Sequence, residues 1–102
     1  MEINALLMDL KDNVVTCVME VPKGSLVVYH KGKEVCTVVA EETIPNCHKA
    51  ALVDFEKDQE VIKYGELIGK TSEPIKIGHL VSDKNIYSVS RDYESEFIKE
   101  AQ

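Results

Sequence analysis

The 102-residue chain contains no tryptophan, and aromatic residues make up 6% of it. Valine, isoleucine and leucine must therefore fill the small core that a domain of this size can bury. No apolar run approaches the roughly 20 residues that a membrane-spanning helix needs. The chain also does not open with the basic, apolar and small-residue series of a signal peptide. We expect one domain over residues 1–102, with its core over about 5–88, in the cytoplasm and away from membranes.

Cysteine is scarce and shows no pairing pattern. Cys17, Cys36 and Cys47 are an odd number and lack CxxC spacing, which is typical of reduced thiols in a cytoplasmic protein. Each lies among apolar neighbours, so we expect each to be a small core residue. Cys47 differs from the other two because a histidine, His48, follows it.

The charge balance and the missing motifs exclude several classes of function. The net charge of −6 repels phosphate backbones, so we do not expect the chain to bind nucleic acid. A few neighbouring lysines can still hold a small anion against that mean field. The sequence has no GxGxxG, GxSxG or P-loop motif, which removes the usual signals of nucleotide binding and serine hydrolysis.

The sequence does contain many short β-branched runs separated by turn residues. The run 14–19 is almost entirely apolar and predicts a buried strand. Seven to nine such strands, with turn signals at close spacing, predict a mainly β fold built as a sandwich, a barrel or an array of hairpins. The other candidate strands and short apolar segments are 5–8, 26–29, 35–39, 48–55, 61–65, 66–69, 75–77, 80–81 and 86–87. Ser90 and the acidic residues after it predict a short C-terminal helix over about 91–100.

One turn pattern recurs along the chain. An apolar residue is followed by two residues, a turn residue, a polar residue and then a strand. The pattern occurs in residues 21–26, 55–61 and 75–80. The copies are too few and too uneven for a solenoid, so we interpret them as reuse of one turn design.

Polar residues whose side chains could take part in catalysis or binding are concentrated between Ile44 and Gly69. His48 and Lys49 follow a proline-containing loop, and a histidine there can act as an acid, a base or a metal ligand. Lys63 offers a point charge and Tyr64 a hydroxyl. The structural alternatives are a surface histidine bonded to a carbonyl, a lysine at a strand edge and a tyrosine half in the core. The two clusters would converge if their strands paired around the turn at 56–59.

Two further polar positions carry weaker signals. His79 has no histidine or cysteine at ligand spacing, and one histidine cannot hold a structural metal. Asp12-Asn13 is turn chemistry, since both side chains can bond their own backbone. Neither position predicts a function by itself.

Taken in order, five phrases resemble a known domain. They are Asp12-Asn13-Val14, Pro22-Lys23-Gly24, Ile44-Pro45-Asn46-Cys47-His48-Lys49-Ala50, Val61-Ile62-Lys63-Tyr64-Gly65-Glu66-Leu67-Ile68-Gly69 and Ile75-Lys76-Ile77-Gly78. The chain is similar, from about residue 5 to residue 85, to the SAF domain or small subunit of the altronate/galactarate dehydratase family. The small subunit of sulfolactate sulfo-lyase is similar too. The resemblance implies a β-clip fold and a hydro-lyase that dehydrates sugar acids beside a larger catalytic chain.

The resemblance also implies roles for individual residues. His48 would be catalytic, and the substrate carboxylate would be bound by Lys49, Lys63, Tyr64, Asn13 and Asn85. Dehydration needs a base for the proton beside the carboxylate and positive charge for the developing enediolate. A divalent metal, iron or manganese, is expected in the full enzyme complex, and none is expected within this chain.

The chain departs from the family at one segment. Members often carry a Gly-x-His-x-His-x-His-Asn segment, and here Leu80, Ser82 and Lys84 stand at the three histidine positions. Asp58 also stands where a glycine is common, and aspartate tolerates that turn. Two hypotheses follow. The chain is the small subunit of a sugar-acid dehydratase or related lyase, or it is a stand-alone binding or regulatory module, such as a homo-oligomer, that has lost the chemistry.

Overall fold

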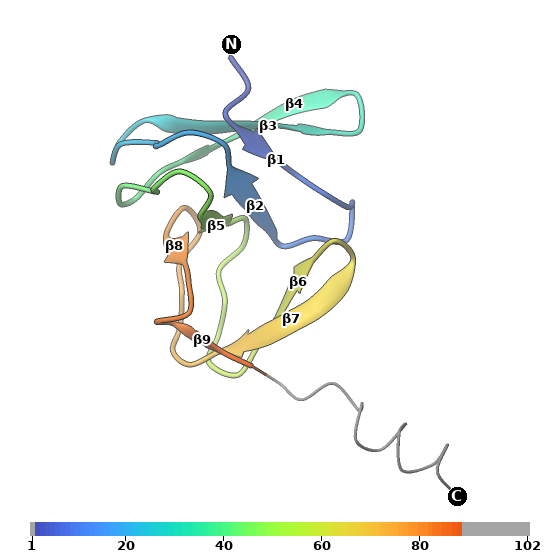
Figure 1. Ribbon diagram of the computed structural model, residues 1–102, viewed down its shortest axis with the longest axis vertical. Coiled ribbons are helices and arrows are strands. Elements are labelled where there is room, and N and C mark those ends of the chain that lie inside the picture. Colours follow the sequence, from blue (N-terminus) through green and yellow to red (C-terminus); the bar gives the residue numbers. More distant parts are fainter. Residues whose placement is uncertain (1, 89–102) are drawn as a thin grey trace, which may run out of the picture.

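A computed structural model describes residues 2–88 of the chain, and within them it contains nine strands and no helix (Figure 1). The prediction of a mainly β fold is confirmed. The helix expected over 91–100 lies outside the described residues. Residues 2–88 therefore contain no helix that is long and apolar enough to cross a membrane.

An antiparallel sheet of four short strands forms the centre of the fold. Its strands, in spatial order, are β1 (Ala5–Leu6), β2 (Val14–Cys17), β5 (Lys49–Ala51) and β8 (Leu80–Val81). Strands that are distant in sequence therefore become neighbours: β5 pairs with β2 on one side and with β8 on the other.

Two hairpins flank the central sheet. One consists of β3 (Leu26–Lys31) and β4 (Glu34–Val39), and the other of β6 (Glu60–Lys63) and β7 (Glu66–Thr71), with β9 (Ile86–Tyr87) paired to β7. In Figure 1 the first hairpin lies above the central sheet and the second lies below it. The chain visits each hairpin between two strands of the sheet.

The central strands contribute to two separate cores because they are buried on both sides. Val15 and Ala50 pack into the first core, together with Val27 and Ile44. Their neighbours Val14 and Ala51 pack into a second core. The rest of that second core is Phe55, Val61, Ile75 and Val81. Alternate residues of a strand point to opposite faces, which explains why the run from Val14 to Cys17 lacks the polar alternation of a half-exposed strand.

Four turns of one design connect these elements, one more than the sequence pattern predicted. Each begins with a buried apolar residue in an isolated antiparallel bridge, Val21 with Ile44 or Phe55 with Ile75. Three residues later the backbone has a positive φ. The four residues are Gly24 (88°), Cys47 (68°), Asp58 (65°) and Gly78 (87°). The turn at Cys47 escaped the sequence analysis because cysteine rarely adopts this conformation.

Two expected strands are shorter than predicted or absent. The strand expected over 48–55 is restricted to β5, because the chain bends after Ala51 and Phe55 forms only an isolated bridge. Residues 75–77 are not a strand either, since Ile75 pairs with Phe55 and the turn to Gly78 begins at once. The apolar run alone could not show where the left-handed turn residues interrupt the pairing.

Gly24 and Gly78 offer a matched test of this turn design, because their φ angles are 88° and 87°. A Cβ at Gly24 would meet no atom within 4 Å, whereas one at Gly78 would lie 2.2 Å from the carbonyl oxygen of Val39. Gly24→Ala should lower the free energy of unfolding by about 1–2 kcal/mol, the cost of a left-handed alanine. Gly78→Ala should cost roughly 1–3 kcal/mol more, because the backbone must shift. Urea melts of both variants measure the difference, and equal losses would contradict it.

Candidate functional site

The β6–β7 hairpin is attached to the central sheet by two polar side chains. The carboxylate of Asp12 accepts hydrogen bonds from the backbone N–H groups of Tyr64 (3.0 Å) and Gly65 (2.8 Å), at the tip of the hairpin. The amide of Asn13 accepts from the N–H of Ile62 (2.8 Å) and donates to the carbonyl of Glu60 (3.0 Å). Asp12 is only 8% exposed. These bonds fix where Lys63 lies relative to the sheet.

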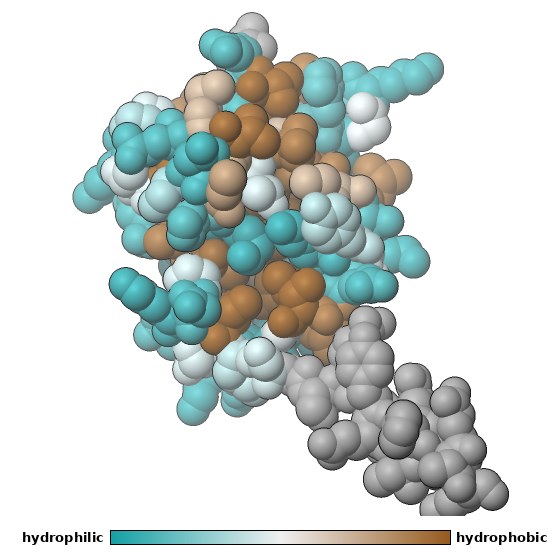
Figure 2. Space-filling view, viewed as in Figure 1, coloured by the Kyte–Doolittle hydropathy of each residue, from teal (hydrophilic) through white to brown (hydrophobic). Residues whose placement is uncertain are grey.

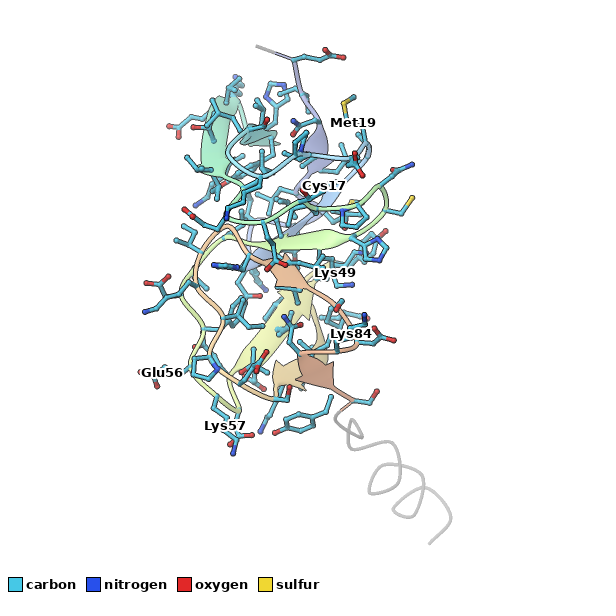
Figure 3. The ribbon with its side chains drawn as sticks, turned by 90° about the vertical axis from the view of Figure 1, so that its left-hand side faces the viewer. Cys17, Met19, Lys49, Glu56, Lys57 and Lys84 are labelled. Carbon is cyan, nitrogen blue, oxygen red and sulfur yellow. The ribbon has the colours of Figure 1, made fainter. Side chains whose placement is uncertain are left out.

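Lys49 occupies the middle of a row of side chains across the central sheet. It pairs with Thr16 of β2 on one side and with Val81 of β8 on the other. Its side chain is on the same strand face as Ala51, at the rim of the second core, and it is half-buried. In Figure 3 Lys84, on the loop after β8, lies below Lys49 on the same side of the molecule.

The structure brings Lys49 and Lys63 close enough for their charges to interact. Burial lowers the pKa of Lys49 from its ordinary value of 10.5, repulsion by Lys63 lowers the pKa further, and Asp83 opposes the change. The two sequence clusters therefore meet through their lysines. They do so across separate sheets, and not by the direct pairing that the sequence analysis considered.

Tyr64 lies at the hairpin tip in a strained conformation. Its φ is 58°, which is uncommon for a bulky residue, and its side chain is 60% exposed. The alternative of a tyrosine half in the core is therefore wrong. The ammonium of Lys63 lies 5.1 Å from the centre of the Tyr64 ring, a cation–π distance. An exposed ring held in a strained turn beside a lysine is more typical of a contact surface than of packing.

His48 is exposed, and its ring bonds back to its own turn. The Nδ1 atom lies 3.0 Å from the carbonyl oxygen of Asn46. A carbonyl only accepts, so Nδ1 carries the proton and Nε2 of the neutral ring is left as the acceptor. This is the carbonyl contact of the structural alternative, yet it also presents Nε2 as a base. No described contact joins His48 to Lys49 or Lys63.

The two asparagines expected to bind substrate both hold backbone in place. Asn13 spans two residues of β6, as described above. Asn85 accepts from the N–H of Ser82 (2.8 Å) and donates to the carbonyl of Leu80 (2.7 Å), which closes the loop between β8 and β9. Each amide keeps one further N–H for a ligand. Their substrate role stays a prediction, and their scaffold role is what the geometry explains.

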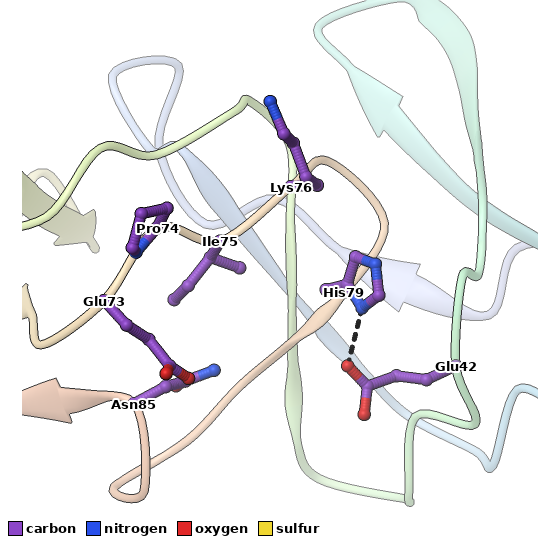
Figure 4. Close-up of a pocket in the computed structure, with 7 residues that line it drawn as sticks. All are labelled: Glu42, Glu73, Pro74, Ile75, Lys76, His79 and Asn85. Carbon is purple, nitrogen blue, oxygen red and sulfur yellow. Dashed lines mark hydrogen bonds and ion pairs between the residues drawn. The ribbon is translucent and has the colours of Figure 1, made fainter.

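A second polar site lies between the two halves of the chain (Figure 4). It is a pocket of about 180 Å³, in which Nδ1 of His79 lies 2.8 Å from Oε2 of Glu42. The remaining lining residues are Glu73, Pro74, Ile75, Lys76 and Asn85. The Glu42 carboxylate also accepts from the N–H of Leu80, so this contact joins the turn before Ile44 to β8. The pocket is absent from the sequence prediction because its residues are 37 positions apart.

The described residues do not fit a divalent metal. Residues 2–88 contain no group of three or more histidine, cysteine, aspartate or glutamate side chains placed to hold an ion. The positions of the family histidines carry Leu80, Ser82 and Lys84, of which none is a usual metal ligand. We therefore assign no metal chemistry to this part of the chain.

The three cysteines lie in three different environments. Cys17 is fully buried, and burial raises the pKa of its thiol to about 11, so it is an inert core residue as predicted. Cys36 is half-buried. Cys47 is exposed, and the expectation of a core residue is wrong there because the left-handed turn directs its side chain outward.

One face of the molecule combines polar and apolar areas. Figure 2 shows hydrophilic side chains across the middle of this face, between an apolar area near β1 and another over the β6–β9 end. Lys49 in Figure 3 lies at this middle level, where the central sheet meets the second hairpin.

We predict that the pKa of Lys49 responds to both of its charged neighbours. Lys63→Met should raise it towards 10.5 but not fully, because burial is the largest cause of the shift. Asp83→Asn should lower it further. Since the unfolded chain binds this proton more tightly, the free energy of unfolding should rise with pH between the folded pKa and 10.5, and less so in Lys63→Met. NMR titration of the Lys49 side chain measures the shifts, and no change in either variant would show that the groups do not form one site.

Comparison with known proteins identifies the family of the chain. A search of curated proteins finds no match. The family model described as the altronate/galactarate dehydratase SAF domain matches residues 3–89, which is most of the chain and includes every residue of the candidate site. The chain therefore belongs to the altronate/galactarate dehydratase SAF-domain family.

Proposed function

We propose that the chain is the small subunit of a sugar-acid dehydratase and binds the carboxylate of the substrate beside a separate large catalytic chain. Membership of a sugar-acid dehydratase domain family supports the reaction class. The observation that supports the carboxylate site is that Lys63 acts electrostatically on the half-buried Lys49, although the two lysines lie on strands that do not pair with each other.

The chemistry of dehydration explains why two lysines are useful. The C–H bond beside the carboxylate and a C–O bond at the next carbon break, a C=C bond forms, and the hydroxyl leaves as water. Negative charge develops on the carboxylate as the proton is removed. Ammonium groups held near it stabilise that charge, most strongly where partial burial reduces screening by solvent. Lys49 meets this condition because it is half-buried.

His48 is the proposed acid or base of this chain. Its Nδ1 contact with Asn46 fixes the tautomer and leaves Nε2 to take or return a proton. The ring lies on the exposed turn before β5, so it would act on a substrate bound between this chain and the large chain. Tyr64 would contribute its hydroxyl from the hairpin tip. The metal of the full enzyme would belong to the large chain.

A second candidate function is a stand-alone binding or regulatory module. The residues at the three family histidine positions favour it, because they lack the ligands for a metal. A sulfolactate sulfo-lyase subunit is a third reading, in which the same lysines would hold a sulfonate or carboxylate. These readings differ in what the chain does when it is purified alone or with a large chain.

We predict that the chain alone dehydrates none of altronate, galactarate and sulfolactate in the presence of iron(II) or manganese, because residues 2–88 contain no complete base and metal set. Co-expression with a dehydratase large chain should give a stable complex and restore activity. Keto-acid or sulfite production by the chain alone would contradict the first part. A self-contained inactive oligomer that captures no large chain would favour the stand-alone module.

We predict that Lys63→Ala and His48→Ala each cost less than about 1 kcal/mol of stability, because His48 is exposed and Lys63, at the end of β6, is only half-buried. Lys63→Ala should weaken carboxylate binding about tenfold or more, the scale of one charge-assisted hydrogen bond. His48→Ala should reduce the rate of the complex with a pH dependence near neutrality. Lys57→Ala is the matched control, because Lys57 is exposed in a turn away from Lys49 (Figure 3).

Urea melts and calorimetric titrations of the three variants separate a site from a scaffold. Losses of several kcal/mol in stability with normal binding would make His48 and Lys63 scaffold residues. Equal weakening by Lys57→Ala would reduce the site to the general charge of the surface.

A further inference from the structure

The hydroxyl of Thr16 is buried and has no hydrogen-bond partner among the described residues. Buried polar groups in proteins are almost always hydrogen-bonded, because an unsatisfied one keeps the full penalty of leaving water. No other side-chain oxygen or nitrogen in residues 2–88 is in this state. This exception lies directly beside Lys49, its partner across β2 and β5.

Thr16 belongs to the same cross-strand row as Lys49. In the central sheet Leu6 pairs with Thr16, Thr16 with Lys49, and Lys49 with Val81. Directly opposed side chains lie on one face, with their Cβ atoms about 4.5–5.5 Å apart. The threonine side chain is therefore the direct cross-strand neighbour of the Lys49 side chain, on the face that carries the second core.

Packing does not require a hydroxyl at this position. The same face of β2 carries Val14 in the second core, and the row ends in Leu6 and Val81. Valine has nearly the shape of threonine and would leave no unsatisfied atom. The threonine lowers the stability of the unliganded chain, and no hydrogen bond of its hydroxyl offsets the loss. This is typical of a group that acts when a ligand is bound.

We propose that Thr16 donates a hydrogen bond to the oxyanion that Lys49 and Lys63 attract, and that it sets the orientation of that anion. This inference rests on the proposed carboxylate site. A lysine ammonium is a point charge with little directional preference, so two lysines alone hold an anion loosely. A fixed hydroxyl on a strand supplies the direction. One oxygen of the carboxylate faces the ammonium groups, and the other accepts from Thr16.

In the proposed site, Lys49 controls access to the hydroxyl. The hydroxyl is covered in the unliganded chain, and Lys49 is its direct neighbour in the row. The lysine side chain has four rotatable carbons, and its ammonium moves towards an arriving anion. That movement uncovers the hydroxyl when its acceptor is present, so the donor is kept from water until then.

The test compares Thr16→Val with Thr16→Ser in the full chain, with galactarate as the probe and galactitol, which has the same hydroxyl pattern without carboxylates, as the neutral control. Calorimetry measures affinity and urea melts measure stability. Thr16→Val should weaken galactarate binding about tenfold, the scale of a charged hydrogen bond. Its stability should equal or exceed that of the parent chain. Thr16→Ser should keep the affinity, and galactitol should bind none of the proteins.

Each other outcome overturns a different statement. Normal galactarate binding by Thr16→Val, with weakened binding by Lys63→Ala, would remove Thr16 from the site and leave the carboxylate function standing. Loss of stability in Thr16→Val would show an internal partner for the hydroxyl and overturn the inference. A parent chain that binds galactarate neither alone nor with a large chain overturns both the inference and the proposed function.

Discussion

The position of the β6–β7 hairpin depends on the hydrogen bonds of Asp12 and Asn13. A two-stranded hairpin is marginally stable by itself and has no fixed orientation. Here its tip is held by a carboxylate that accepts from two backbone N–H groups, and its first strand by an amide that bonds to residues 60 and 62. This attachment determines the positions of Lys63 and Tyr64 relative to the central sheet. The charge that faces Lys49 is thus placed by residues that carry no positive charge themselves.

The same solution occurs at the other hairpin. The amide of Asn4 donates to the carbonyl of Leu26 and accepts from the N–H of Val28, as the amide of Asn13 does with residues 60 and 62 of β6. The isolated bridges and left-handed turns are also duplicated. The fold therefore consists of two similar hairpin units joined by a shared sheet. Both hairpin tips carry a lysine, Lys31 paired with Glu34 and Lys63 paired with Glu66. Within the described residues only the second unit adds an exposed tyrosine and an aspartate anchor at its tip, so the two units share an architecture and differ in chemistry.

The sequence predicts local structure well where the cause is local. The β-branched run predicts strand β2, and the glycines predict the turns in which they lie. The mainly β fold class follows from these local signals. The turn at Cys47 was not predicted, because cysteine, unlike glycine or asparagine, does not favour the positive φ that this position has. The residues by themselves indicated only turn chemistry at Asp12 and Asn13, and the resemblance added substrate binding at Asn13. Neither revealed their role in anchoring the hairpin, since their partners lie about 50 positions later in the chain. Thr16 gave no signal, because its unsatisfied hydroxyl exists only once the chain is folded.

The sharing of β2 and β5 between the two cores bears on how the chain unfolds. Val15 and Ala50 pack on one side of these strands, and Val14 and Ala51 pack on the other. If either hairpin detached, it would expose one face of strands that still support the opposite core. The two halves are therefore coupled through a single layer of β-sheet, whose strands β2 and β5 contribute to both cores. Despite the two cores, we therefore expect the chain to unfold as one cooperative unit, so that a ligand that stabilises one half protects both.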